Sequence, residues 1–481
     1  MSDPGLPGPR GTTAAYVWAS MARDPLRTYE RLAARYGDAL TVPFSPGHAF
    51  YLLSRPEHLE HVLVTHQDDY PKAFTYRPLR AFLGSGLLTS EGDLWRRHRR
   101  LVQPVFARRR LEPFAAHFAA AARRMSGRLD RLDGTADLAA LMQSLTLDIV
   151  GRTLFGTDLG ADAARIGQAI AALQRATLVA SFLPTIGSTA ATRRVMSRLP
   201  GAPRAVRTLE EVVGGTVARR RARPAPDEPR DMLDLLLAAR DSDGRALSEE
   251  EIADEVATFL LAGHETTANA LIWATTLLSR YPRARGRLED EADAAPEVID
   301  ADAADKLTWT RAVLNETLRL YPPAWTIERE ARVDDTIAGV PVPAGATLAV
   351  PPYLLHRRPD VWPNPEGFDP ARFLPGRAER HRYAFAPFGG GRRICDRRRL
   401  RHHGGHDPAG RAGPPPPHRP GPGRASDADG VRHAPPGGPH PRDRPAPLTR
   451  PESGAGGHRV GRAAVALAAP AAGVLARGAG Q

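Results

Sequence analysis

The only cysteine of this 481-residue chain closes a stretch rich in glycine and arginine. Phe388 to Cys395 read Phe-Gly-Gly-Gly-Arg-Arg-Ile-Cys. A single thiol cannot form an internal disulfide or a four-thiolate metal site, so its reactivity or its capacity to bind a metal is the better explanation for it. The glycines allow a tight turn that approaches a flat cofactor closely, and the arginines favour the thiolate. We therefore predict that Cys395 is a metal ligand; the alternative is a glycine turn with a buried structural cysteine.

A long, largely buried helix is predicted from Ser248 onwards. Ser248 and Glu251 have the spacing of a capping box, and an apolar stretch follows them. The middle of this helix contains Gly263, Glu265 and Thr266. Glycine inside a helix costs about 1 kcal/mol relative to alanine, and threonine weakens it further, so helix stability does not explain the cluster. The alternative is that Glu265 faces solvent and Thr266 bonds to its own helix.

Three further segments carry charged residues at regular spacing. Glu316 and Arg319 are three residues apart on a predicted helix and can pair, although such a pair alone is worth under about 1 kcal/mol. Downstream, Pro365 to Phe373 read Pro-Glu-Gly-Phe-Asp-Pro-Ala-Arg-Phe. Upstream, a tryptophan and four arginines with a histidine fill positions 95–100. Taken alone, such a charge run predicts a solvated helix face.

Together and in this order, the four segments resemble the signatures of the haem-thiolate monooxygenases, the cytochrome P450 family. The family pattern around the cysteine is Phe, two residues, Gly, any, Arg, any, Cys, any, Gly. Phe388, Gly391, Arg393 and Cys395 match it, but Arg397 stands where the family has its last glycine. The resemblance implies a mainly α fold with small β-sheets, a large helical domain with a small β-rich region, and haem b with Cys395 as its axial ligand.

The resemblance also implies the roles of other residues. Glu265 and Thr266 would be catalytic and relay protons to dioxygen, which would bind in a groove at Gly263. Glu316, Arg319 and Arg372 would form a buried triad that supports the cysteine loop without taking part in the chemistry. The haem-binding residues implied by the resemblance are Trp95, Arg99, Gly263, Arg329, His356, Phe388, Gly391, Arg393 and Cys395, of which Trp95, Arg99, Arg329 and His356 would hold propionates.

The function implied is a monooxygenase that inserts one atom of O2 into a hydrophobic substrate, such as a lipid, a terpenoid or another secondary metabolite. Electrons would come from a ferredoxin and its reductase, which would dock on a basic face with Arg97, Arg100, Arg392 and Arg393 as candidates. We expect a monomer without a nucleic-acid partner. The alternative is a catalytically impaired, haem-binding remnant of such an enzyme, because the carboxyl end is altered.

Apolar spacing predicts mostly helices and few strands. The predicted helices cover residues 20–36, 57–66, 94–108, 111–132, 136–154, 161–180, 201–221 and 248–281, with a further segment at 308–320. The predicted strands cover 39–42, 49–53 and a hairpin within 336–351. The pattern loosens between 176 and 204, where the resemblance implies a mobile substrate lid.

No run of about 20 apolar residues is present, and residues 1–11 are polar and rich in proline and glycine, so we expect neither a membrane anchor nor a secretory signal. A lone free cysteine suits a reducing cytoplasm. The formal net charge is +12, which raises the alternative of a nucleic-acid-binding protein. Two observations argue against a nucleic-acid-binding protein. The sequence indicates no basic groove lined with aromatic residues, and most of the excess charge lies in the tail.

The composition changes abruptly after Cys395, which divides the chain into a catalytic domain, 1–395, and a low-complexity tail, 396–481. The tail contains 15 Pro, 16 Gly, 14 Arg and 7 His but no Phe, Trp, Tyr, Lys, Ile, Asn or Met. Its 14 arginines exceed its 6 acidic residues by eight, so the tail carries most of the net charge. Residues of this kind cannot bury a core, and we expect the tail to be disordered.

A one-nucleotide shift of the reading frame explains this tail. The codons of residues 396–407, read from one nucleotide later, permit Ile-Gly-Gly-Gly-Phe-Ala-Thr-Met-Glu-Ala-Thr-Thr, and those of Pro408 and Ala409 permit Leu-Leu. That frame restores the missing glycine and an amphipathic helix after the cysteine. Further on, the codons of Leu448 and Thr449 permit a stop. We therefore predict that the chain as written folds poorly or binds haem weakly, whereas the frame-restored chain is an enzyme.

Overall fold

The computed structural model describes residues 5–45, 48–106, 114–131, 135–181, 189–224, 226–296, 301–376 and 380–395. The predicted tail, 396–481, and residues 182–188 of the predicted lid lie outside this part of the chain.

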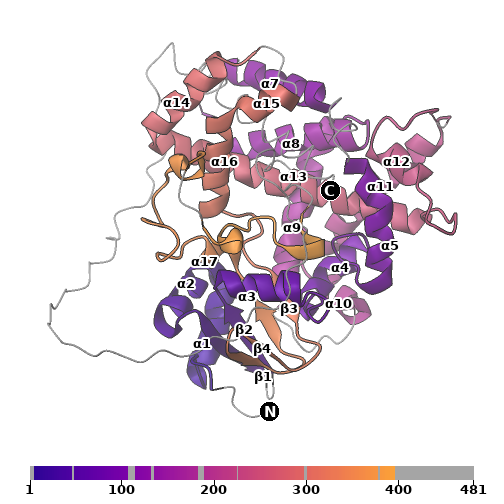
Figure 1. Ribbon diagram of the computed structural model, residues 1–481. Helices are drawn as coiled ribbons and strands as arrows, with labels where there is room; N and C mark the ends of the chain where they lie inside the picture. The colour runs from indigo at the N-terminus through magenta and orange to yellow at the C-terminus, as the bar shows by residue number, and fades with distance from the viewer. Residues whose placement is uncertain are drawn as a thin grey trace.

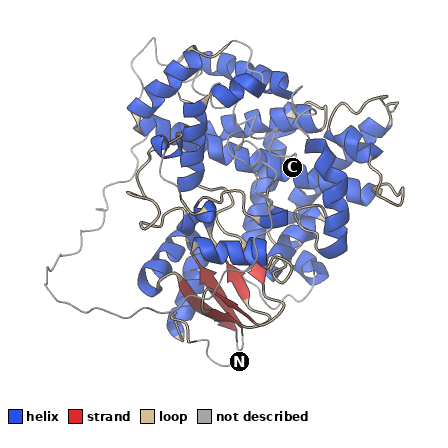
Figure 2. Cartoon of the chain, in the orientation of Figure 1, coloured by secondary structure: helices blue, strands red, loops and turns tan. Residues whose placement is uncertain are grey.

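Helices dominate the described chain, and small sheets gather at one end of it, so the predicted fold class is confirmed (Figure 2). The helices are α1 (Thr12–Arg23), α2 (Pro25–Tyr36), α3 (Pro56–Glu60), α4 (Arg77–Leu83), α5 (Gly92–Val102), α7 (Phe114–Asp130), α8 (Leu138–Leu154), α9 (Ala163–Ser181), α10 (Thr189–Met196), α11 (Ala202–Arg221), α12 (Met232–Ala238), α13 (Glu249–Arg280), α14 (Pro282–Asp293), α15 (Ala301–Lys306), α16 (Thr308–Leu320) and α17 (Pro352–Leu355). Short turns of 3-10 and π-helix connect some of them.

The larger sheet joins strands from both ends of the described chain. Its order is β1-β2-β6-β3, with β1 (Ala39–Ser45) antiparallel to β2 (His48–Leu53), β2 parallel to β6 (Thr347–Ala349), and β3 (Glu328–Glu330) antiparallel to β6. A second pair, β4 (Asp335–Ile337) and β5 (Val340–Val342), forms the predicted hairpin. Figure 1 shows α1, α2 and α3 beside these strands. The sheet thereby brings Arg329, on β3, close to the amino-terminal part of the chain.

The long helix α13 runs through the middle of the helical part (Figure 1). The predicted capping box is confirmed: the Ser248 hydroxyl accepts from the Glu251 N–H at 3.1 Å, and Glu251 accepts from the Ser248 N–H at 2.8 Å. The helix continues without a break through Gly263, where a Cβ would lie 3.0 Å from Cγ2 of Val150 on α8. Close packing of two helices is therefore one physical reason for a glycine at this position.

Some predicted boundaries were wrong for local reasons. The predicted helix 20–36 is two helices, because Asp24 caps α2 by accepting from the Arg27 N–H at 3.1 Å and Pro25 begins the new helix. The predicted helix 94–108 ends as α5 at Val102 and continues as a 3-10 turn that contains Pro104, which cannot donate a helical hydrogen bond.

Candidate functional site

The cysteine loop is a compact turn closed by its own backbone. The Gly389 N–H donates to the Ala386 carbonyl at 3.1 Å, and the Cys395 N–H donates to the Phe388 carbonyl at 2.9 Å. Gly389 and Gly391 have φ angles of 76° and 68°, which other residues adopt only with strain. The Cys395 side chain is exposed, so the alternative of a buried structural cysteine does not fit. The loop presents a thiol that is open to a ligand.

The absence of a side chain at Gly391 allows a close contact within the protein itself. A Cβ at Gly391 would lie 1.8 Å from the Leu63 carbonyl oxygen and 2.7 Å from Oε1 of Gln67. The next N–H, that of Arg392, donates to the same Gln67 oxygen at 2.8 Å. Sequence reasoning assigned the glycines to the approach of a flat cofactor; at Gly391 the close approach is to the segment that follows α3. Any side chain here displaces the loop that ends at Cys395.

A cluster of cations lies beside this loop. Arg393 donates to the Ser90 carbonyl at 3.2 Å, pairs with the Glu91 carboxylate, and stacks over the Trp95 ring with its guanidinium carbon 4.2 Å from the ring centroid. Lys72 donates from Nζ to the same Ser90 carbonyl at 2.9 Å and lies 3.5 Å from Glu91. Lys72 and Glu91 were missed by the sequence analysis, although Lys72 is one of only two lysines in the chain.

Positive charge is in excess in this cluster. Burial lowers the pKa of Lys72 to about 7, and the charge of Arg393 adds to the effect. Burial likewise lowers the pKa of Arg393 to about 10, although Glu91 opposes the shift. Arg329 is buried, forms an isolated backbone bridge with Lys72, and adds a third positive charge. Lys72 and Arg393 share the carboxylate of Glu91, and Arg329 acts on the buried carboxyl of Glu328, whose pKa burial raises. Three cations with so little paired negative charge suit a ligand with two carboxylates, which fits the propionates of haem.

The other predicted propionate residues differ in their surroundings. Trp95 is buried on α5, and Arg99 lies half-buried one turn later on the same helix. His356 is fully buried, and both of its ring nitrogens are engaged: Nδ1 lies 3.2 Å from the Arg319 carbonyl, and Nε2 accepts from the Ala386 N–H at 2.9 Å. Burial lowers the pKa of His356 to about 3, which keeps it neutral. His356 has no nitrogen left for a propionate, contrary to expectation, and it instead holds the start of the cysteine loop.

The two predicted catalytic residues lie on α13 but have different environments. The Thr266 hydroxyl donates to the Ala262 carbonyl at 2.8 Å, as the alternative for this residue stated. Glu265 is half-buried and bonded to Gln174 on α9, and burial raises the pKa of its carboxyl. Glu265 therefore does not simply face solvent. A carboxyl with a raised pKa stays protonated over a wider pH range and suits the role of a proton donor.

The predicted triad is present. Glu316 and Arg319 are fully buried and pair twice, at 2.7 and 2.8 Å, and Nε of Arg372 lies 3.3 Å from Glu316. Arg319 also donates to the carbonyls of His356, Pro365 and Gly367 at 2.9, 2.6 and 2.9 Å. These bonds tie α16 to the segment before the cysteine loop. The triad therefore has the scaffolding role that the sequence analysis expected.

The four candidate docking arginines are not equivalent. Arg97 is mostly buried and donates to Asp241 at 2.8 Å and to Glu251 at 2.6 Å. Arg393 is engaged in the cation cluster. Arg100 and Arg392 are exposed, and Arg392 pairs with Asp68 at 3.1 Å on the surface. Only Arg100 and Arg392 thus have the exposure that a docking surface needs.

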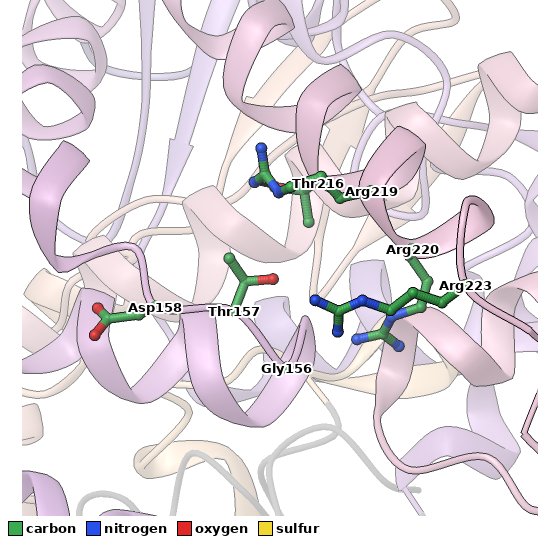
Figure 3. A pocket seen from close by; sticks show the side chains of 7 residues that line it. All are labelled: Gly156, Thr157, Asp158, Thr216, Arg219, Arg220 and Arg223. Carbon is green, nitrogen blue, oxygen red and sulfur yellow. Dashed lines mark hydrogen bonds between the residues drawn. The ribbon is translucent and has the colours of Figure 1, made fainter.

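A polar pocket of about 190 Å³ lies elsewhere, between the end of α8 and the last turns of α11 (Figure 3). It is lined by Gly156, Thr157, Asp158, Thr216, Arg219, Arg220 and Arg223. Arg220 is buried and bonded to Asp231, Asp234 and the Phe155 carbonyl, while Thr216 and Thr157 donate to backbone carbonyls. These bonds stabilise the turn, and none of the predicted site residues lines the pocket.

Two further findings concern the described residues as a whole. No helix there is both long enough and apolar enough to cross a membrane. The same residues contain no group of three or more His, Cys, Asp or Glu that could hold a metal ion.

Comparison with known proteins agrees with this geometry. A family model described as Cytochrome P450 matches residues 4–398. The chain is 36% identical over 375 residues to "Putative cytochrome P450 132" of Mycobacterium tuberculosis, covering 73% of this chain and 77% of that protein. It is 34% identical to "Cyclooctatin synthase" of Streptomyces melanosporofaciens, covering 78% and 81%, and 33% identical to "Pentalenene oxygenase" of Streptomyces avermitilis, covering 79% and 83%.

Proposed function

The chain belongs to the cytochrome P450 family and is a haem-dependent monooxygenase, and from this premise we propose that it binds haem b through Cys395 and oxidises a hydrophobic, terpenoid-like substrate. The observation that carries the haem proposal is the excess of buried cations beside the cysteine loop. Lys72 and Arg393 share the carboxylate of Glu91, and Arg329 adds a third positive charge beside Lys72; a ligand with two propionates matches these cations. Trp95 and Arg99 complete the proposed propionate set, and His356 is left out of it.

Individual residues of the chain take the remaining roles in ligand binding and proton delivery. Haem, when bound, would supply the activation of dioxygen, and a thiolate ligand would supply electron density to it. Cys395 provides that sulfur, and the loop from Phe388 holds it in place. Glu265 provides protons, and the hydroxyl of Thr266 passes them on after it leaves the Ala262 carbonyl. The apolar faces of the helices exclude water from the substrate.

Replacing Glu265 by glutamine is expected to lower kcat by about a hundredfold or more, because a positioned general acid is lost. Burial raises the pKa of Glu265, and the acid acts only while protonated. The wild-type rate is therefore expected to fall as pH rises through that raised pKa, whereas the Glu265→Gln rate stays flat. Steady-state turnover against pH measures both effects. Glu249→Gln, at an exposed carboxyl on the same helix, serves as the control; equal pH profiles for wild type and Glu265→Gln would exclude the role.

Lys72 offers a direct test of the propionate set. Haem carboxylates beside Lys72 are expected to raise its pKa from about 7 and to shield it, so acylation of Lys72 slows at least about tenfold when haemin is added. Reaction of the frame-restored chain, the form expected to take up haem, with an amine-acylating reagent, followed by mass spectrometry, measures the rate. Lys306, the other lysine and an exposed one, is the internal control.

The haemin experiment has a matched ligand control. The dimethyl ester of haemin has the same ring and iron but no carboxylates, and it is expected not to protect Lys72. Protection by the ester as good as that by haemin, or no protection by haemin, speaks against a propionate site at Lys72 and Arg393.

The substrate and the partner are proposed on separate grounds. Relatives named "Cyclooctat-9-en-7-ol 5-monooxygenase" and "Pentalenene oxygenase" favour the terpenoid among the hydrophobic substrate classes. A chain with one cysteine cannot hold a four-thiolate iron–sulfur cluster, so electrons come from outside; we propose a ferredoxin and its reductase, which dock where Arg100 and Arg392 are exposed. A monomer in a reducing cytoplasm completes the proposal.

A second candidate function follows from one observation, Arg397 in place of the family's glycine. In this alternative, the protein still binds haem but no longer catalyses the oxidation. The carbon monoxide difference spectrum of the reduced protein separates the two, because an intact thiolate-ligated haem gives a strongly red-shifted Soret band.

A further inference from the structure

His98, on α5, lies in a buried ion cluster that the proposed chemistry does not use. Its side chain and that of Glu255 on α13 are fully buried, with Nδ1 2.7 Å from Oε1 of Glu255. Its other nitrogen, Nε2, lies 3.2 Å from Oε1 of Glu251. Each ring nitrogen faces a carboxylate oxygen, which can only accept, so both nitrogens must carry hydrogen. With both carboxyl groups ionised, this geometry favours the imidazolium.

The charged groups around His98 come from α13, from α5 itself and from the segment before α13. Glu251, Asp254 and Glu255 are on α13, and Arg97 donates to Glu251 and to Asp241. Burial by itself lowers the pKa of His98, but the hydrogen bonds and charges of Glu255 and Glu251 outweigh it, so the pKa is raised. The imidazolium is thus retained to a higher pH than in a free histidine.

Helix α5 also forms one side of the cation cluster around Lys72 and Arg393. Ser90 and Glu91, which directly precede α5, accept from Lys72 and Arg393, and Trp95 in the first turns of α5 carries the Arg393 guanidinium. The helix therefore has two attachments: its amino-terminal end to the cluster, and its middle to α13 through His98 and Arg97. A shift of the middle moves the end, because a short helix moves as one body.

We propose that His98 is a positioning residue: as an imidazolium between Glu251 and Glu255, it fixes α5 against α13 and keeps Glu91 and Trp95 in place around Lys72 and Arg393. The proposal concerns the protein itself and holds with or without a bound cofactor. Its consequence for haem, that α5 holds the propionate set in position, rests on the proposed function.

The two lysines of the chain make the test specific. The Lys72 side chain is 8% exposed, and Lys306 is exposed. In the full chain, His98→Gln is expected to speed the acylation of Lys72 at least about tenfold, because one partner of a buried ion pair has been removed, and to leave Lys306 unchanged. Hydrogen exchange of the peptide that covers α5 is expected to increase with it. His117→Gln, at an exposed histidine on α7, is the matched control.

Two further variants separate positioning from simple packing. Glu255→Gln keeps the volume and one acceptor, and it is expected to speed Lys72 acylation less than His98→Gln does. The double variant His98→Gln with Glu255→Gln leaves no buried carboxylate without its cation, so it is expected to recover most of the protection that His98→Gln loses.

The pH dependence has a definite sign. Because the folded-state pKa of His98 is raised, its stabilising effect is fully present below about pH 6.5, the pKa of an unfolded histidine, and is lost as pH rises through the folded-state value. The ratio of Lys72 acylation rates, His98→Gln over wild type, is therefore expected to be largest in mild acid and to approach one in alkali.

Three results overturn the proposal: an unchanged Lys72 rate in His98→Gln, a double variant as reactive as the single one, or a rate ratio that does not depend on pH. The haemin experiment tests the proposed function and not the role of His98. A frame-restored chain that takes up no haemin contradicts the proposed function, whereas the comparison of lysine rates between variants still decides the role of His98.

Discussion

Restoring the reading frame after codon 395 is expected to raise the haem content of the purified protein from a small fraction to near-stoichiometric occupancy. The described chain ends at Cys395 with an exposed thiol, and residues 396–481 contain no Phe, Trp, Tyr, Ile or Met. The codons of the shifted frame permit Phe-Ala-Thr-Met-Glu-Ala and Leu-Leu, which would supply the apolar side of a helix. A helix that packs behind the loop holds the sulfur in place and shields it from water, and both effects favour ligation.

Apolar side chains of the described part give this expectation a physical basis. Trp273, near the end of α13, is 39% exposed and stacks on Tyr321 with ring centroids 3.8 Å apart. Tyr281, just after the same helix, is also 39% exposed. Both aromatic side chains thus leave apolar surface open at the end of α13.

Haem per mole of protein, measured for both forms after identical expression, decides between them. Arg397→Gly in the chain as written restores the glycine of the family pattern without restoring the helix. It is expected to leave the haem content low. Equal occupancy of the written and restored chains would defeat the frame hypothesis, and full occupancy in Arg397→Gly would show that the glycine alone accounts for the loss.

The features that the sequence predicted correctly were local or rested on the family resemblance. The capping box of Ser248 and Glu251 was predicted because its partners are three residues apart. The pair of Glu316 and Arg319 follows from the same helical spacing, although only the resemblance joined Arg372 to it. The mainly α fold followed from apolar periodicity together with the resemblance.

The features that the sequence could not predict depend on contacts between distant segments. His356 looked like a propionate ligand, but its nitrogens are used by backbone groups of Arg319 and Ala386, 37 and 30 residues away. Arg97 looked like an exposed docking residue, but Asp241 reaches it from 144 residues further along the chain. Spacing along one helix contains no information about such partners.

Lys72 and His98 were missed for the same reason. The cation cluster at Lys72 is joined by hydrogen bonds between residues up to 303 positions apart, and no short motif around Lys72 indicates it. His98 stands inside a run of arginines that resembles a solvated face, yet it is buried against Glu255, 157 residues away. A useful signal was rarity, since a chain that uses arginine almost everywhere keeps only two lysines.

Replacing Cys395 by serine in the frame-restored protein is expected to abolish the red-shifted Soret band of the reduced carbon monoxide complex, together with monooxygenase turnover. A serine hydroxyl does not ionise near neutral pH, so the axial anion that donates electron density is lost. Some pigment is expected to remain, because Lys72, Arg329, Arg393 and Trp95 still match the propionates.

Retention of pigment without the shifted band separates the two parts of the site, cation cluster and sulfur ligand. Arg392→Ala, at the exposed neighbour that bonds Asp68, leaves the thiol in place and is expected to keep the band, which controls for disturbance of the loop. If the serine variant absorbs as the parent does, the sulfur of Cys395 is not the iron ligand. In that case the cation cluster still accounts for porphyrin binding, and another axial group has to supply the charge that activates dioxygen.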